Sequence, residues 1–447
     1  MPQAHPAPSF PPETFRARRE RYLERAGSAV TVLCAAPELH RSRDTEIRYR
    51  QDSDFHYLTG FPEPGAVAVL TPHDPERRFT LFVRPRDPER EAWSGPRAGV
   101  EGARERYGAD AAYPVGELDA QLRTLLEPAD EVVYALGTNP EMDRRVAGLV
   151  AGFRRSRPRS GKGPLVVRDP DTLLPEMRLV KEPGELDRIR RAAQISAAAH
   201  LTAMRAAHPG IGEWELEAVL DRHFRVAGGS GPAYPTIVGS GPNATVLHHV
   251  ANDRCAADGD LVLIDAGAEL GMYAGDITRT FPVSGRFSAT QRAVYEIVLE
   301  AEEAGIAAVR PGASVFDPHD AAVRVLARGM VELGLLSGDV DELIESGAHR
   351  RFYMHQTSHW LGLDVHDVGP YRRGGEPVRL EPGMVLTVEP GIYVPETAED
   401  VPEELRGIGV RIEDNLVVTP EGHEVLTRGV PVSIEEIEAL VGSGGGG

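Results

Sequence analysis

Lysine is almost absent from this chain. Only Lys162 and Lys181 occur among 447 residues, and there is no glycine-rich phosphate loop of the Walker type. A lysine-based Schiff base and a P-loop are therefore disfavoured. Basic residues are scarce as a group, since 49 lysines and arginines stand against 68 acids and give a net charge of −19. A chain without a basic surplus is poorly suited to hold phosphates, which argues against nucleic acid or an anionic membrane as a partner.

Cysteine and long apolar runs are scarce as well. Cys34 and Cys255 lie far apart and in no metal-binding spacing, which favours a reducing compartment, with both as buried or neutral thiols. The first residues show neither the basic start nor the apolar core of a signal peptide, and no apolar run approaches the length of a membrane span. The sequence therefore predicts a soluble, cytoplasmic protein.

The first part of the chain alternates short strands and helices, which predicts a compact α/β domain. A loop-like stretch, Asp169–Pro175, follows it. We therefore expect an N-terminal domain at residues 1–175, a second domain at 176–442 and a flexible tail at 443–447. No catalytic group of residues stands out in the first domain. We interpret His56 and Trp93 as core aromatics and Arg154–Arg159 as a solvated charged face.

The second domain contains an internal repeat. Two helices separated by a Pro-Gly turn are predicted twice, and each pair precedes a strand that ends in an acid. The predicted helices are Glu185–Ala207 with Glu213–Ala227, and Gln291–Val309 with Phe316–Leu333. The domain is therefore expected to be α+β, built from two related halves at roughly 180–285 and 286–440.

Each half also carries two acids near its strands. The apolar run Leu261–Ile264 ends in Asp265, and Asp276 follows after a turn, so the two carboxylates face each other across a hairpin. Residues 382–391 align without a gap on residues 258–267, and Glu389 is aligned with Asp265. Glu413 then supplies a second acid in this half, as Asp276 does in the first half. Because buried acids placed side by side need a neutralising cation, we expect the two strand pairs to form one divalent metal site.

Histidines are concentrated in one segment of the second half. His355, His359 and His366 lie within twelve residues, and His248-His249 precede the first hairpin. The spacing of His355 and His359 also occurs in zinc peptidase helices, but Gln356 occupies the glutamate position and Gly362 makes a long helix unfavourable.

Four carboxylates would balance the charge of two divalent cations, and one of these histidines would add a softer ligand. The oxygen-rich set favours manganese and leaves zinc, cobalt and iron as alternatives. The other histidines suit proton transfer or binding of a substrate carbonyl.

On these motifs the chain resembles the creatinase/methionine-aminopeptidase ("pita-bread") metallopeptidase family, and within it looks like the bacterial Xaa-Pro aminopeptidases (aminopeptidase P). The similarity is weaker in the N-terminal domain, at Tyr49–Phe55 and Thr59–Phe61, but covers nearly the whole chain. The matching stretches of the second domain are Thr236–Gly241, Leu263–Gly267, Gly275–Phe281, Ser358–Asp367, Thr387–Tyr393 and Arg411–Asp414.

The resemblance implies a dinuclear metal enzyme that removes the first residue from peptides with proline in the second position. The implied metal ligands are Asp265, Asp276, His359, Glu389 and Glu413, with Asp276 and Glu413 bridging the two ions. The implied catalytic residues are Glu389 as the proton shuttle, with His248, His366 and His355. The implied substrate-binding residues are His248, His366, Tyr393 and Arg411. Trp93 matches loosely a tryptophan that contacts a neighbouring subunit in tetrameric relatives, so a homodimer or homotetramer is expected.

Other members of the same fold provide the alternatives. A prolidase would cut Xaa-Pro dipeptides with a similar metal set, but the linker Met177–Glu185 favours the aminopeptidase. Methionine aminopeptidases normally lack the large N-terminal domain. Metal-free creatinase chemistry and a metal-free binding module are both disfavoured, because all five ligand positions are filled.

Overall fold

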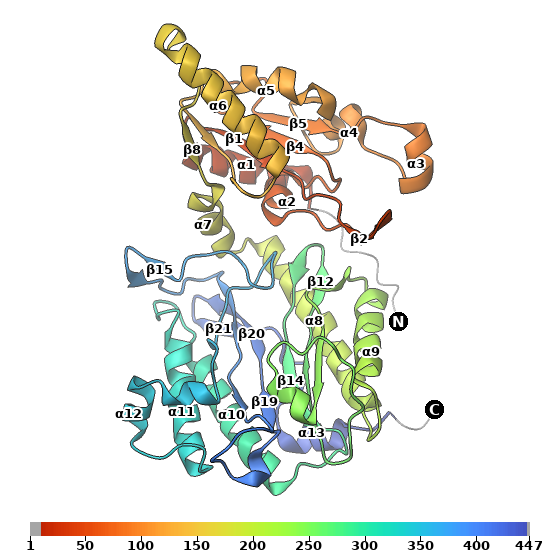
Figure 1. The fold of residues 1–447 in the computed structure, drawn as a ribbon, viewed down its shortest axis with the longest axis vertical. Helices are drawn as coiled ribbons and strands as arrows, with labels where there is room; N and C mark the ends of the chain where they lie inside the picture. Colours follow the sequence, from red (N-terminus) through yellow and green to blue (C-terminus); the bar gives the residue numbers. More distant parts are fainter. Residues whose placement is uncertain (1–9, 445–447) are drawn as a thin grey trace. The chain divides into compact units, whose positions relative to one another are not determined.

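The computed structural model describes residues 10–444. The chain divides into two compact units, with Met177 as the last residue of one and Arg178 as the first residue of the other (Figure 1). The predicted boundary at residue 175 stays a prediction. Of the predicted tail, Ser443 and Gly444 are described, and the backbone N–H of Gly444 donates to the carbonyl of Arg205. The remainder of the tail, 445–447, lies outside the described residues.

The N-terminal unit is built on a six-stranded mixed sheet with the order β6-β5-β4-β1-β7-β8. Its strands are β1 (Val30–Cys34), β4 (Val67–Leu70), β5 (Phe79–Val83), β6 (Ala111–Pro114), β7 (Glu131–Val133) and β8 (Val166–Arg168), beside the small ribbon β2 (His40–Ser42) and β3 (Thr45–Glu46). Its helices are α1 (Pro12–Ala26), α2 (Ser53–Thr59), α3 (Pro88–Ser94), α4 (Gly99–Glu105), η1 (Val115–Glu117), α5 (Leu118–Leu126), α6 (Pro140–Ser160), η2 (Pro170–Thr172) and α7 (Leu174–Leu179), which ends beyond the division.

Side chains of β1 alternate between the two faces of this sheet. Val30 and Val32 pack with apolar residues of α5 and α6 in one core cluster. Thr31 points the other way and donates a hydrogen bond of 3.1 Å to the Tyr22 hydroxyl of α1. The predicted α/β domain is therefore confirmed, and its sheet has helices on both faces.

The interpretation of Trp93 as a core residue is wrong. Its side chain is 92% exposed, because α3 buries none of its residues. His56, in contrast, packs edge-on against Phe15 with ring centroids 5.8 Å apart.

The second unit contains several short antiparallel sheets. Its strands are β9 (Gly231–Pro232), β10 (Ile237–Ser240), β11 (Leu261–Asp265), β12 (Ala268–Leu270), β13 (Tyr273–Ala274), β14 (Thr278–Pro282), β15 (Arg372–Arg373), β16 (Glu376–Pro377), β17 (Val385–Val388), β18 (Gly391–Tyr393), β19 (Gly409–Arg411), β20 (Asp414–Thr419) and β21 (Gly422–Val425). Its further helices are α8 (Pro183–Ala206), α9 (Glu213–Val226), η3 (Gly241–Thr245), α10 (Ala289–Ala308), α11 (Asp317–Glu332), α12 (Val340–Glu345), η4 (Ala348–Arg351), η5 (Glu403–Leu405) and α13 (Ile434–Leu440).

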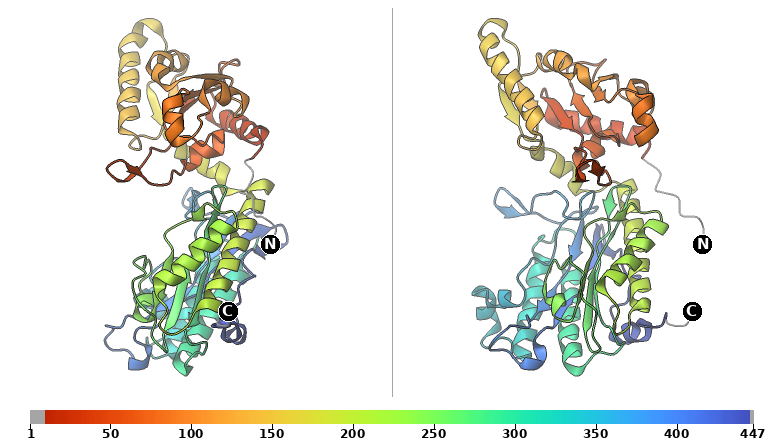
Figure 2. Two further views of the ribbon diagram at one scale, coloured as in Figure 1. Left: turned by 90° about the vertical axis from the view of Figure 1, so that its right-hand side faces the viewer. Right: turned by 45° about the vertical axis from the view of Figure 1, so that its right-hand side comes forward.

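The four long helices form close to the predicted bounds because their ends carry strong signals. Glu182 and Glu185 form a capping box at the start of α8, and Ser288 and Gln291 form another at the start of α10. The strands of both halves lie between the pair α8–α9 and the pair α10–α11 (Figure 2).

The two halves meet along their acid-bearing strands. One half contributes the sheet β10-β11-β14 and the other the sheet β17-β20-β21. A β-bridge joins Thr278 to Glu413 across the halves. The fully buried Arg279 reinforces it by donating to the Glu413 carbonyl at 2.7 Å and to Asp414 Oδ1 at 2.8 Å. The predicted α+β unit of two related halves is confirmed.

No helix within residues 10–444 is both long enough and apolar enough to cross a lipid bilayer.

Candidate active site

A cavity of about 580 Å³ opens where the two halves meet. Nine of the predicted site residues line it. Tyr393 is fully buried and does not line it, but its hydroxyl is hydrogen-bonded to His355, which does. The nine are Asp265, Asp276, Glu389, Glu413, His248, His355, His359, His366 and Arg411. Residues from distant parts of the chain therefore converge on one concave space, as in most small-molecule sites.

Strand pairing places the four acids. Asp265 ends β11 and pairs with Thr278, the first residue of β14, so Asp276 is brought back beside it. Glu389 follows β17 directly, and Glu413 lies between β19 and β20, opposite Thr278. Rigid strand ends thus aim the acids of both halves at the same point.

The side chains of the acids are held close to one histidine. His359 Nε2 lies 3.4 Å from Asp276 Oδ2 and 3.3 Å from Glu389 Oε1. One ligand atom each from Asp276, His359 and Glu413 lies within 4.8 Å of the others. Such a set of oxygens and one imidazole suits a divalent cation.

The electrostatics of the chain favour a cation at this point. Burial raises the pKa of Glu413 well above its ordinary value, and the charges of Asp276, Glu389 and Asp265 raise it further. Burial likewise raises the pKa values of Asp276 and Glu389. Burial alone would lower the pKa of His359, but its hydrogen bond to Asp276 and the charge of Glu389 outweigh that effect and raise it. Bound cations would relieve this repulsion and keep the acids ionised, so the residues fit a metal centre.

A chain of donors lies behind the acids. Arg411 Nη2 donates to Asp265 Oδ2 at 2.6 Å, its Nε to the Thr278 hydroxyl at 3.1 Å and its Nη1 to the Tyr393 hydroxyl at 3.0 Å. Because arginine cannot accept, Tyr393 is left to donate its own proton to His355 Nε2, 2.8 Å away. Burial, followed by the charge of Arg411, lowers the pKa of His355 to about 4, so this ring is neutral near pH 7.

His248 and His366 are exposed on the cavity wall. The ring centroid of His366 lies 4.4 Å from that of His359. Burial lowers the pKa of His366, and the charges of His359 and His248 lower it further, which favours the neutral ring. The segment from His355 to His366 forms no helix, which agrees with the rejection of a zinc-peptidase helix.

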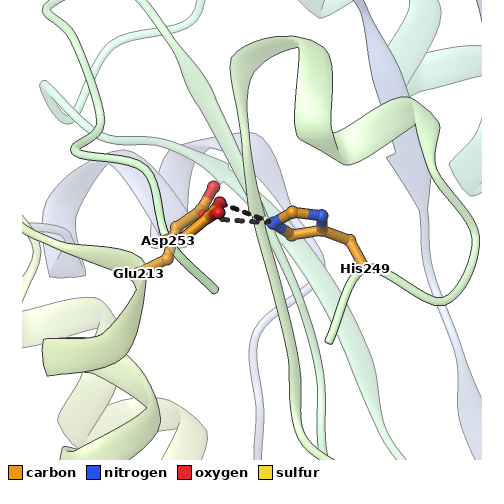
Figure 3. A group of neighbouring side chains, drawn as sticks. All are labelled: Glu213, His249 and Asp253. Atoms are coloured by element: carbon orange, nitrogen blue, oxygen red, sulfur yellow. Dashed lines mark hydrogen bonds and ion pairs between the residues drawn. The ribbon is translucent and has the colours of Figure 1, made fainter. Parts of the chain in front are cut away.

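The neighbouring His249 does not line the cavity. Figure 3 shows its ring nitrogen facing Glu213 and Asp253, with Nε2 3.1 Å from Glu213 Oε2 and 4.0 Å from Asp253 Oδ1. Asp253 is 75% exposed, and Glu213 already accepts hydrogen bonds from Ser240, Asn243 and the Arg254 backbone. With those lone pairs occupied, this group is a poor metal site.

Sequence reasoning missed two donors to the acids. The Tyr234 hydroxyl lies within hydrogen-bond distance of Asp265 Oδ1, at 2.6 Å, and of Asp276 Oδ1, so these two acids share its one proton, and the Thr278 hydroxyl donates to Glu413 Oε2 at 2.6 Å. Thr278 begins β14 two residues after Asp276, and this spacing could have indicated Thr278. Nothing in the sequence around Tyr234 indicates its role.

A metal-dependent peptidase is the class of protein that this fold and cavity define. The chain belongs to metallopeptidase family M24, whose family model matches residues 187–420, and the model for the aminopeptidase P N-terminal domain matches residues 15–134. The predicted family, fold class and enzyme class are thereby confirmed.

Individual relatives resemble the chain along nearly its full length. The Xaa-Pro aminopeptidase of Escherichia coli strain K12 is 47% identical over 432 residues, which are 96% of this chain and 97% of that protein. The structure of the Pseudomonas aeruginosa aminopeptidase PepP is 51% identical, with a TM-score of 0.93 over 96% of this chain and 98% of that one. Zinc-substituted E. coli aminopeptidase P in complex with product is 46% identical, with a TM-score of 0.92 over 97% and 98% of the two chains.

Proposed function

We propose that this protein is an Xaa-Pro aminopeptidase, which hydrolyses the bond after the first residue of peptides whose second residue is proline. The observation that carries this proposal is the convergence of four acids, four histidines and Arg411 on one cavity. The similarity to proteins named Xaa-Pro aminopeptidase over nearly the whole chain supports the same activity.

We assign the five metal ligands to Asp265, Asp276, His359, Glu389 and Glu413, which would hold two divalent ions. Manganese is proposed as the metal, because oxygen donors dominate the set. When bound, the ions supply an activated water and a Lewis acid for the scissile carbonyl.

The chain's own groups complete the reaction. Glu389 would move a proton from the attacking water toward the departing proline nitrogen, because its carboxylate lines the cavity beside His359. His248 and His366, exposed in the cavity, donate hydrogen bonds to the substrate carbonyl as negative charge develops on it. Arg411 and Tyr393 hold Asp265 and the neutral His355 in place, and His355 contacts the peptide.

The cavity wall also explains the preference for proline. Apolar side chains share the lining with the histidines, namely Pro235, Ile237, Leu247, Val250 and Val365. Proline has no N–H and a fixed φ angle, so its apolar ring would pack against these side chains without leaving a donor to be satisfied.

We further propose a cytoplasmic homodimer or homotetramer. The cysteines support the compartment, since Cys34 and Cys255 are free thiols. The exposed Trp93 on α3 supports association, because a large exposed aromatic favours an interface. Light scattering of the wild type and of Trp93→Ala tests the association.

Prolidase activity is the alternative, and substrate length separates the two. The wild type is treated with a chelator, reloaded with manganese and given Xaa-Pro and Xaa-Pro-Yaa-Zaa peptides. Faster, metal-dependent cleavage of the longer peptide is expected. Cleavage restricted to the dipeptide would make the protein a prolidase, and no cleavage of either with metal bound would contradict both activities.

Two substitutions test the ligand assignment. Asp276→Asn and His359→Ala are expected to lower kcat at least about a hundredfold while the fold is retained, because each removes a ligand. The exposed Asp253→Asn and His208→Ala serve as matched controls with unchanged turnover. Full activity of a metal-loaded Asp276→Asn sample would contradict the assignment.

A further inference from the structure

The loop at residues 246–254, here called the His248 loop, forms part of the cavity wall without belonging to any helix or strand. It contributes Leu247, His248 and Val250 to the lining. A segment without ladder hydrogen bonds keeps its position only if other groups hold it. Helix α9 supplies those groups.

Glu213, the first residue of α9, holds both ends of this region. Its buried carboxylate accepts hydrogen bonds from the Ser240 backbone N–H at 2.7 Å, Asn243 Nδ2 at 3.0 Å, the Arg254 backbone N–H at 3.0 Å and His249 Nε2 at 3.1 Å. A negative charge is also favourable at a helix N-terminus. The carboxylate therefore connects strand β10, helix η3 and two points of the His248 loop.

One turn further along α9, Glu217 holds the middle of the loop. Its Oε2 accepts from Asn252 Nδ2 at 2.8 Å. The same amide donates to the Thr236 carbonyl at 2.9 Å, and Asn252 Oδ1 accepts from the Val238 backbone N–H at 3.0 Å. Because β10 is the outer strand of its sheet, the Asn252 side chain takes the place of a neighbouring strand.

We propose that Glu213, Glu217, His249 and Asn252 are positioning residues that fix the His248 loop and so place His248 in the cavity. The two adjacent histidines have different roles. His249 is hydrogen-bonded to Glu213 and holds the loop, and His248 lines the cavity. This inference rests on the proposed function only for the role of His248.

A double-mutant cycle with the longer peptide tests the proposal. His249→Leu removes the donor to Glu213 and is expected to lower kcat/KM about ten- to a hundredfold, because a small misplacement of a catalytic group slows the reaction. His249→Gln, which keeps an N–H donor, is expected to restore most of the loss. In a His248→Ala background, His249→Leu is expected to have no further effect, because His249 acts through His248.

Asp253→Asn is the matched control within the same loop and is expected to leave kcat/KM unchanged. Two results would overturn the proposal. One is an independent effect, in which His249→Leu lowers kcat/KM by the same factor with and without His248. The other is an equal loss in Asp253→Asn, which would make the three residues of Figure 3 a single functional group.

A second measurement is independent of turnover. Hydrogen exchange of the full, metal-loaded chain is expected to speed up in the His248 loop and in β10 for His249→Leu and Asn252→Asp, and to stay unchanged in α10 and α11. If the wild type cleaves no Xaa-Pro peptide, the proposed function fails while this exchange result still decides the positioning role. Unchanged exchange in the loop would refute that role.

Discussion

At the scale of single residues, hydroxyl and guanidinium donors fix the acids of the site before any ion binds. Thr278 and Arg411 each donate to one carboxylate oxygen, and the Tyr234 hydroxyl is shared by Asp265 and Asp276. Burial, followed by the charge of Asp265, raises the pKa of Tyr234 well above its ordinary value, so its hydroxyl remains a donor. Donors of this kind orient metal ligands and tune their affinity.

Tyr234→Phe is therefore expected to weaken metal binding about 10- to 100-fold, because it removes the donor shared by Asp265 and Asp276. Calorimetric titration of the chelated protein with manganese measures the affinity. Tyr295→Phe is the matched control, since it removes a hydroxyl that donates at 2.8 Å to the Val432 carbonyl rather than to an acid of the site. Equal affinities of Tyr234→Phe and the wild type would show that the hydroxyl does not orient the ligands.

At the scale of elements, the sequence predicts strands and helices from local signals but does not predict side-chain contacts between residues far apart in the chain. The strands ending at Asp265 and preceding Glu389 were predictable, because turn glycines and apolar runs mark them twice in the same order. The contacts of Tyr234 with Asp276 and of Glu213 with His249 span 42 and 36 residues and leave no periodic signal. Trp93 was misjudged because an aromatic residue in a short helix carries no mark of its exposure.

A buried cluster of two cations and one acid is another long-range contact that the sequence does not predict. Arg178 and Lys181 both contact Asp367, the residue next to His366, and the side chains of all three are at most 3% exposed. Val180 forms a β-bridge to Met384, so this segment is tied to the strands of the second half. The scarcity of lysine was visible in the sequence, but the partner of Lys181 was not.

Asp367→Asn is expected to lower the free energy of unfolding at pH 7 by about 3–5 kcal/mol, because it leaves two buried cations without their shared carboxylate. Burial would raise the pKa of Asp367, but Lys181 and Arg178 outweigh it and hold the pKa below its ordinary value of 3.8. This contribution is therefore fully present above that value and is lost as the pH falls through the lowered pKa.

Urea unfolding of the wild type and of Asp367→Asn at pH 7, 5 and 3 checks both points. The difference between the two proteins is expected to be constant between pH 7 and 5 and smaller at pH 3. Asp364→Asn, which removes the more exposed partner of Arg178, serves as a control with a smaller effect. A difference that grows as the pH falls would contradict the assigned sign.

At the scale of the whole molecule, metal binding is expected to stabilise the junction between the two halves of the second unit. Asp265 and Asp276 come from one half, Glu389 and Glu413 from the other, and their charges repel across the junction. Arg279 and the Thr278–Glu413 bridge offset part of that repulsion. Cations held between the halves would offset the rest and so stabilise the folded chain.

Metal removal is therefore expected to lower the melting temperature as well as the activity. At manganese concentrations about 100 times the Kd, binding to the folded state adds about 2.7 kcal/mol to its stability. Because burial raises the pKa of Glu389 to about 7, the chelated protein holds a proton there near pH 6, and adding metal at that pH is expected to release it. Thermal unfolding with and without manganese, together with proton release in weak buffer, measures both effects.

The Asp276→Asn variant should show a smaller shift in melting temperature and fewer released protons. Identical melting temperatures of chelated and reloaded wild type would refute the coupling of metal binding to the junction of the halves.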